Sequence, residues 1–163
     1  MLIAIPRHSP WRCSVKQGST QDAPALRRRR RRRFPFPKAH RRAILVVEDD
    51  TAIAEALVGF LEDEGFVAVR AGDGEQALSV LAGMQPYPGL ILLDLMMPRM
   101  DGWRFRDLQL RDEGLRSIPV VVLSAHGASI AEQALMAPAA VLRKPCSADA
   151  LLEVVQQHFR RFN

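Results

Sequence analysis

The feature that most constrains the fold is a set of short, mostly apolar runs that alternate with longer amphipathic segments. The runs are AILVV (43–47), VAVRA (67–71), LILL (90–93), IPVVVL (118–123) and AAVLR (139–143). Strands that lack a polar face must be buried on both sides, and a parallel sheet covered by helices on both faces buries them in this way. The pattern therefore predicts an α/β fold from residue 43 onward.

Amphipathic segments fill the gaps between these runs. We expect helices over about 52–64, 73–83, 102–111, 128–136 and 147–161, the first with Thr51 as its N-cap and Gly65 at its C-terminal end. The helix over 102–111 would carry Trp103, Phe105 and Leu108. The connections leave room for right-handed crossovers, so the chain predicts a doubly wound (βα)5 parallel sheet. Such sheets bind ligands beyond the carboxyl ends of their strands.

The net charge of +5 is the sum of two regions of opposite sign. Residues 1–42 contain 13 lysines and arginines against one acid, Asp22, whereas residues 43–163 contain 10 against 17. Seven consecutive arginines (27–33) and five prolines leave the first region with little apolar surface to offset its ordering entropy. We therefore expect a disordered basic tail over 1–42 and a folded, acidic domain over 43–163.

Signals for export or membrane insertion are missing from the sequence. The opening MLIAIP is too short for the apolar core of a signal peptide, and no apolar run approaches the roughly 18 residues of a membrane span. Cys13 and Cys146 lack the CxxC spacing of a zinc site and suggest no disulfide framework. We expect a soluble cytoplasmic protein without membrane partners.

Polar residues follow four of the five expected strands. They are Glu48, Asp49 and Asp50 after the first strand, Asp94 after the third, Ser124 after the fourth and Lys144 after the fifth. The carboxyl ends of parallel strands share one edge of a sheet, so these groups should converge. Clustered carboxylates repel unless a cation holds them, and Mg²⁺ prefers such oxygen ligands. The pattern predicts a Mg²⁺ site, with Lys144 and Ser124 facing an anion.

Four segments resemble the response-regulator receiver domains of two-component signalling. They are ILVVEDD (44–50), LILLDLMMPRMDG (90–102), VVVLSA (120–125) and LRKP (142–145), and the resemblance covers about 43–161. It implies a flavodoxin-like sheet with strand order 2-1-3-4-5. It also implies that Asp94 is the phosphoacceptor and that the phosphoryl donor is a histidine kinase or a phosphotransfer protein.

The resemblance further implies a role for each site residue. Asp49 and Asp94 would ligate Mg²⁺ directly, Glu48 through water, and Met96 through its backbone carbonyl. Lys144 would pair with the phosphoryl oxygens, and Pro145 after it suggests a cis peptide bond. Ser124 would be the switch hydroxyl, while Met96 and His126 would tune phosphoryl hydrolysis. The chain departs from the family at Val141, where Tyr or Phe is usual.

Several functional interpretations stay open at this level. The chain stops at Asn163, soon after the last expected helix, so we expect a stand-alone receiver that signals through protein partners and is not an enzyme beyond slow acyl-phosphate hydrolysis. In the competing interpretation, the basic tail binds nucleic acid through its phosphates and the receiver modulates that binding. Residues 1 to about 40 could also be an upstream mis-assigned start. A haloacid-dehalogenase-like phosphatase is disfavoured, because the DxD that follows the first strand in such enzymes is absent.

Overall fold

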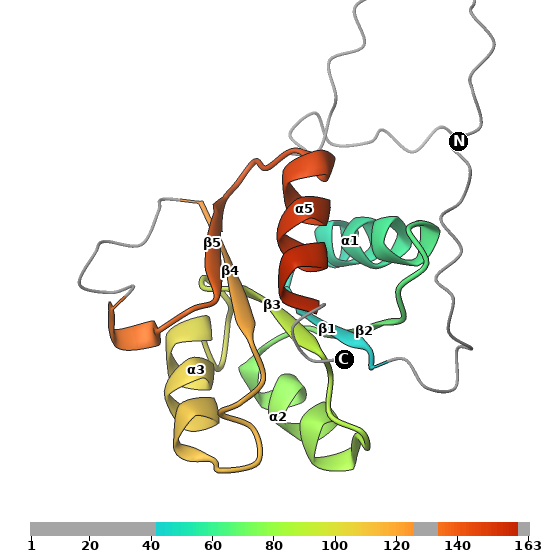
Figure 1. Cartoon of the computed structure of the whole chain (residues 1–163). Helices are drawn as coiled ribbons and strands as arrows, with labels where there is room; N and C mark the ends of the chain where they lie inside the picture. Colours follow the sequence, from blue (N-terminus) through green and yellow to red (C-terminus); the bar gives the residue numbers. More distant parts are fainter. Residues whose placement is uncertain (1–41, 126–133, 160–163) are drawn as a thin grey trace, which may run out of the picture.

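The computed structural model describes residues 42–125 and 134–159. Its strands are β1 (Ile44–Val47), β2 (Ala68–Ala71), β3 (Leu90–Asp94), β4 (Val120–Ser124) and β5 (Ala140–Arg143). Its helices are α1 (Thr51–Asp63), α2 (Gly74–Gly83), α3 (Gly102–Arg111) and α5 (Ala148–Phe159). A further helical turn covers residues 134–136. Strands and helices alternate along the chain as the apolar pattern predicts (Figure 1).

The five strands form one parallel sheet in the order β2-β1-β3-β4-β5. This order confirms the doubly wound, flavodoxin-like prediction. The three inner strands, β1, β3 and β4, are buried along their whole length, whereas the edge strands β2 and β5 are partly exposed. Apolar residues on both faces of a strand are therefore found where a sheet covered on both sides requires them.

Two apolar clusters lie on opposite faces of the sheet. Within β1, Leu45 and Val47 belong to one cluster and Ile44 and Val46 to the other, as the alternation of side chains along a strand requires. The first cluster includes residues of α2 and α3, and the second includes residues of α1 and α5. Figure 1 shows the same two layers, with α1 and α5 together on one side of the sheet and α2 and α3 on the other.

The start of α1 corrects one prediction. Thr51 is the first helical residue, and the N-cap is Asp50, whose carboxylate accepts hydrogen bonds from the amides of Ala52 and Ile53 at 2.8 and 3.1 Å. Asp and Thr are both good N-caps, so composition alone could not decide between adjacent positions. At the other end of the helix, Gly65 has a φ of 89°, the left-handed conformation expected after a helix C-terminus.

The buried face of α3 includes two large polar side chains. Phe105 is buried, Trp103 and Leu108 are partly buried, and the other large buried side chains are Arg106 and Gln109. Arg106 donates from Nε to the carbonyl of Met136 and from Nη2 to the carbonyl of Ala137, both at 2.8 Å. Burial lowers the pKa of this guanidinium. The interior thus contains a guanidinium that donates to two backbone carbonyls.

Some predictions fall outside the described residues. These are the basic tail up to residue 41, most of the helix expected over 128–136, His126, and the end of the chain beyond residue 159. In the described ranges, no helix combines the length and apolar character that a membrane span requires.

Candidate functional site

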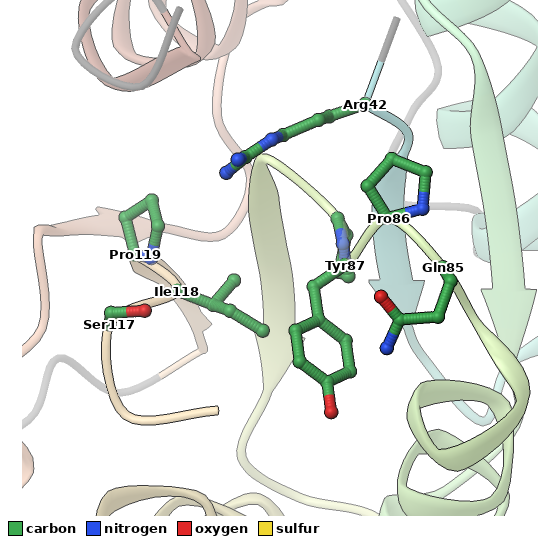
Figure 2. A pocket seen from close by; sticks show the side chains of 8 residues that line it. Arg42, Gln85, Pro86, Tyr87, Ser117, Ile118 and Pro119 are labelled. Atoms are coloured by element: carbon green, nitrogen blue, oxygen red, sulfur yellow. The ribbon is translucent and has the colours of Figure 1, made fainter. Parts of the chain in front are cut away.

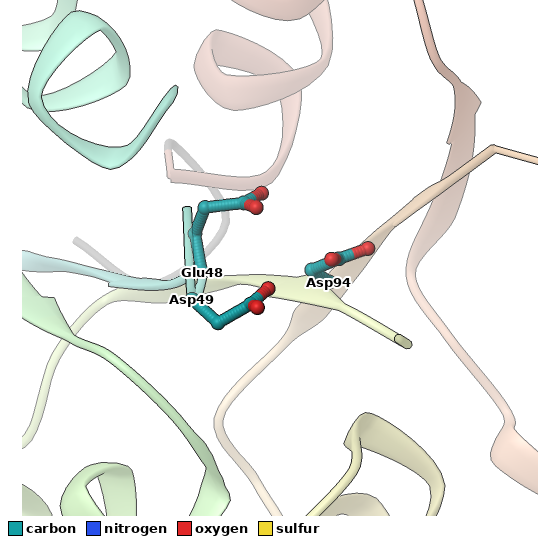
Figure 3. A group of neighbouring side chains, drawn as sticks. All are labelled: Glu48, Asp49 and Asp94. Atoms are coloured by element: carbon teal, nitrogen blue, oxygen red, sulfur yellow. The ribbon is translucent and has the colours of Figure 1, made fainter. Parts of the chain in front are cut away.

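Three carboxylates meet where β1 and β3 end. The two strands are neighbours in register, with Val47 opposite Leu93, so Glu48 and Asp94 extend from adjacent strand ends. One oxygen from each of Glu48, Asp49 and Asp94 lies within 4.8 Å of the others, and Figure 3 shows the side chains of Glu48 and Asp49 extending toward Asp94. Glu48 and Asp94 are buried, whereas Asp49 is exposed. The structure therefore brings together three of the four acids that the sequence predicts to converge, whereas Asp50 caps α1 instead.

Lys144 reaches the same cluster from the end of β5. Its Nζ lies 2.7 Å from Oε2 of Glu48 and 3.2 Å from Oδ1 of Asp94. The Lys144 amide donates to the carbonyl of Ser124 at 2.8 Å, which ties the lysine backbone to the end of β4. The peptide bond between Lys144 and Pro145 is cis, as the resemblance implies. The ammonium group is thus directed toward the carboxylates from two strands away.

The ionisation of these groups reflects burial and mutual contact. Burial raises the pKa of Glu48, and the nearby Asp94 adds to the increase, while the hydrogen bond and charge of Lys144 offset part of it. Burial acts to lower the pKa of Lys144, but its contacts with Glu48 and Asp94 outweigh that effect and raise its pKa. The lysine is therefore protonated at neutral pH, and its charge stabilises two carboxylates that would otherwise repel each other.

The donor set fits a hard divalent cation. All three side chains offer carboxylate oxygens, and the one ammonium contacts two of them, Glu48 and Asp94, so three acids share a single cation. Mg²⁺ is bound by one or two carboxylates together with waters and phosphate oxygens, and the exposure of Asp49 leaves one side of the cluster open to solvent. The chemistry of the described residues is thus compatible with the predicted Mg²⁺.

Ser124 and Met96 lie beside this cluster. Asp94 pairs with Leu123 in the register of β3 and β4, so Ser124, the next residue and the last of β4, lies at the same edge of the sheet. Ser124 is 7% exposed. Met96, two residues after Asp94, has a side chain that is 73% exposed, while the neighbouring Met97 is buried in the core. Both predicted residues are therefore at the correct end of the sheet.

The loop from Leu95 to Asp101 returns the chain to Asp94. A Cβ atom added at Gly102 would lie 2.3 Å from the backbone oxygen of Asp94, so the first residue of α3 is in direct contact with the end of β3. The Gly102 amide donates to the carbonyl of Leu95 at 3.1 Å, and Asp101 caps α3 through the amide of Arg104 at 2.8 Å. The Leu95 amide donates to Oδ1 of Asp94 at 2.9 Å. These contacts fix the carboxylate and its loop.

An ion pair between this loop and α2 is not evident from the sequence. Arg99, in the loop, contacts the buried carboxylate of Asp73, the N-cap of α2. The two residues are 26 positions apart, and Arg99 makes the contact from a left-handed backbone conformation. An N-cap signal at Asp73 can be recognised in the sequence, but its arginine partner cannot.

A cavity of about 230 Å³ lies at the opposite end of the sheet. Its lining comes from residues that precede β1, β3 and β4, namely Arg42, Gln85, Pro86, Tyr87, Pro88, Ser117, Ile118 and Pro119. Figure 2 shows Arg42 extending across the start of the sheet above Tyr87 and Pro119. This cavity is formed at the amino ends of the strands, so it is separate from the carboxylate cluster.

Comparisons with known proteins agree with this geometry. Residues 44–156 match the family model described as the response regulator receiver domain. The chain is 45% identical over 86 residues to the phosphate regulon transcriptional regulatory protein PhoB of Klebsiella pneumoniae, a match that covers 53% of this chain and 37% of that protein. It is 42% identical over 85 residues to the DNA-binding response regulator MtrA of Mycolicibacterium smegmatis, covering 52% and 35% respectively. The match thus spans little more than a third of these curated relatives.

Solved structures give the same result. The receiver domain of the Francisella response regulator 1452 is 29% identical, with a TM-score of 0.66, and the match covers 75% of this chain and 99% of that one. A sensor protein from Polaromonas sp. JS666 is 28% identical, with a TM-score of 0.66 and coverage of 76% and 99%. The family model covers more than half of the chain, and the fold, strand order and acidic edge agree with it. The chain belongs to the response regulator receiver domain family.

Proposed function

We propose that this domain accepts a phosphoryl group on Asp94 from a histidine kinase or a phosphotransfer protein. The observation that carries the proposal is the convergence of Asp94 with Lys144 and two further acids at one edge of the sheet. A nucleophilic carboxylate, a fixed cation and a set of oxygen donors are the equipment that phosphoryl transfer needs, since its catalysis depends mainly on positioning and charge neutralisation.

Asp94 supplies the nucleophile. Its Oδ1 already accepts from the Leu95 amide and contacts Lys144, which leaves Oδ2 as the oxygen that attacks phosphorus. A bond forms between Oδ2 and phosphorus, the bond between phosphorus and the donor's imidazole nitrogen breaks, and its electron pair stays on that nitrogen. The product is an acyl phosphate on Asp94. Held by two donors, the carboxylate does not need to reorient before attack.

Lys144 neutralises charge on the transferred group. In the described structure its ammonium is held by Glu48 and Asp94, so it is within reach of a phosphoryl group attached to Asp94. A compact ammonium with three donors can contact phosphoryl oxygens while keeping one carboxylate contact. Ser124, buried at the end of the next strand, supplies the switch hydroxyl that donates to a phosphoryl oxygen.

Asp49, Asp94 and the Met96 carbonyl would hold Mg²⁺, with Glu48 as the outer acid of the set. When bound, the ion supplies positive charge to the oxygens of the group in transfer. The acidic cluster supports this assignment through its oxygen chemistry and its excess negative charge.

The wider biological role is part of the same proposal. The domain acts as a signalling module in a phosphorelay rather than as an enzyme, it works in the cytoplasm, and it passes its state to protein partners as a stand-alone receiver. Phosphorylation shifts the population between two arrangements of the domain, which is how a small covalent change can alter a protein surface. A pull-down with the acetyl-phosphate-treated protein, compared with an Asp94→Asn variant, tests for partners that depend on phosphorylation.

Phosphorylation itself can be tested with acetyl phosphate and Mg²⁺ on a phosphate-affinity gel. We expect a retarded band for the native protein and none for Asp94→Asn. Asp101→Asn is a matched control in the same loop, because Asn replaces Asp well as an N-cap and should keep α3 capped. A retarded band in the Asp94→Asn protein would place the phosphoryl group elsewhere and refute the proposal.

A second candidate function is supported by the relatives and by the tail sequence. MtrA is described as a DNA-binding regulator, and residues 1–42 of this chain carry 13 basic residues. We propose as the alternative that the basic arm binds nucleic acid through phosphate contacts, with strong salt dependence. Gel shifts of the full chain and of a protein lacking residues 1–42 test this alternative. Binding at low salt that disappears with the arm supports it, and no shift at low salt refutes it.

A further inference from the structure

Arg99 has a backbone conformation that an arginine adopts only at a cost. Its φ is 63°, in the left-handed region, and it lies in the loop that follows Asp94. For a residue with a Cβ this conformation is sterically unfavourable, and glycine would avoid that cost. A side-chain contact of Arg99 can offset this cost.

The partner is the carboxylate of Asp73, which is completely buried at the start of α2. Oδ1 of Asp73 accepts the Gln76 amide at 2.9 Å and so caps the helix. Oδ2 accepts Arg99 Nε at 2.7 Å and also contacts Arg99 Nη2. Both oxygens of the buried acid are therefore engaged, one by its own helix and the other by the loop.

A second contact joins the same two segments. The Gly74 amide donates to the carbonyl of Met100 at 3.1 Å, and a Cβ at Gly74 would lie 2.6 Å from Cγ of Met100. The first residues of α2 are thus packed against residues 99 and 100. On the other side of the loop, Gly102 is in contact with the backbone of Asp94. The segment between these fixed points contains Met96, whose carbonyl is assigned to the ion site.

The two members of the pair differ in exposure. The side chain of Arg99 is 56% exposed, whereas the carboxylate that it contacts is completely buried. A buried carboxylate without a cationic partner carries an uncompensated charge, so the contact keeps Arg99, and the loop that contains it, against the start of α2.

We propose that Arg99 and Asp73 are positioning residues for the phosphoacceptor site, acting through the loop that connects Asp94 to α3. This inference rests on the proposed function of Asp94. The pair anchors the loop to α2, so the Met96 carbonyl and the Asp94 carboxylate keep the relative placement that phosphoryl transfer requires. Residues that orient site groups from outside typically change activity or metal affinity about 10-fold to 100-fold when removed.

Two variants remove the contact from opposite sides. Arg99→Gly deletes the guanidinium and also relieves the backbone strain, while Asp73→Ser deletes the charge and keeps an N-cap for α2. The two variants should therefore differ in folding stability, whereas both should slow phosphorylation of Asp94 by a similar factor. Arg111→Ala is the matched control, because it breaks an exposed arginine–aspartate pair on α3, 2.8 Å to Asp107, that does not contact the loop.

The rate of phosphorylation by acetyl phosphate and the half-saturating Mg²⁺ concentration should be measured at a temperature where each variant is folded. We expect both single variants to lose about tenfold in rate, the double variant to lose no more than either, and Arg99→Lys to recover part of the loss. Amide hydrogen exchange gives a readout independent of activity: Gly74 and Gly102 should exchange faster in both single variants and normally in Arg111→Ala.

The outcomes separate this inference from the function on which it rests. Rates and amide exchange within about twofold of the native values in both folded variants would overturn the positioning role while leaving Asp94 as the phosphoacceptor. Losses that multiply in the double variant would also overturn it, because they would show independent effects. If the native protein takes up no phosphoryl group, the proposed function fails first, and the positioning role fails with it.

Discussion

The ammonium group of Lys144 lies 2.7 Å from the carboxylate of Glu48, a residue 96 positions earlier in the chain. The contact exists because β5 and β1 end at the same edge of a parallel sheet, although β3 and β4 separate them. It holds a cation against two acids that are both largely buried, and it makes the charge balance of the site sensitive to a change in any one member.

Replacement of Lys144 should therefore reduce both stability and function. Lys144→Met keeps much of the side-chain volume but leaves Glu48 and Asp94 close together without their cation. We expect the free energy of unfolding at neutral pH to fall by about 1–3 kcal/mol and phosphorylation to be strongly slowed. Urea titrations with and without Mg²⁺ check the cause. The ion should restore more stability to the variant than to the native protein, and an equal effect on both would contradict this explanation.

Metal dependence should distinguish two adjacent acids. Asp49 belongs to the carboxylate cluster, whereas Asp50 caps α1 through two amides. Asp49→Asn should raise the Mg²⁺ concentration needed for phosphorylation by about tenfold or more, and a chelator should abolish phosphorylation of the native protein. Asp50→Asn is the matched control, since Asn also serves as an N-cap and should leave the Mg²⁺ requirement unchanged. Equal Mg²⁺ curves for the two variants would exclude Asp49 as a ligand.

Two glycine substitutions should have opposite effects on stability. A methyl group at Gly102 would meet the backbone oxygen of Asp94 at 2.3 Å, so Gly102→Ala must displace either the loop or the helix. Gly59 lies within α1 with nothing within 4 Å of an added Cβ. We expect Gly102→Ala to destabilise the domain by about 1–3 kcal/mol and Gly59→Ala to stabilise it by about 0.5–1 kcal/mol. Thermal unfolding of both proteins provides the measurement.

The stability contributed by Asp73 should be lost in acid. Burial acts to raise the pKa of this carboxyl, but the Gln76 amide and Arg99 outweigh it and lower the pKa below the ordinary value of 3.8. The folded protein then binds the proton less readily than the unfolded chain, so the contribution is complete at neutral pH and declines as the pH falls below about 4. The difference in unfolding free energy between the native protein and Asp73→Ser should follow this course. A difference that grows on acidification would have the wrong sign.

The strands, and the edge of the sheet at which the site lies, could be predicted because both follow from the order of apolar and polar residues along the chain. Apolar runs such as Leu90–Leu93 require burial on both sides, and the polar residues that follow them must meet at one edge of a parallel sheet. The chain positions of Asp49, Asp94 and Lys144 were sufficient to predict that their side chains converge, whereas their roles in phosphoryl transfer remain predictions. Cis Pro145 came from family resemblance and not from the residue pattern.

Other contacts could not be predicted because they depend on backbone groups whose positions the sequence does not reveal. An arginine on an amphipathic helix is normally expected at the surface. Arg106 is buried instead, and its guanidinium donates to the carbonyls of Met136 and Ala137. Arg99 likewise pairs with Asp73 from a left-handed backbone conformation, which the sequence does not reveal. Charged residues are assigned to solvent unless a partner is known, and here the partners are fixed by tertiary structure.

The close approach of Gly102 to the Asp94 backbone has a consequence for redesign of the loop. In a randomised library, position 102 should strongly favour glycine and position 97 should favour side chains that fill the same interior space, whereas the exposed position 96 should tolerate chemical variety. Under the proposed role of Asp94, Met96 is the position to vary first when the lifetime of the acyl phosphate is to be changed, because its exposed side chain can be replaced without repacking the core.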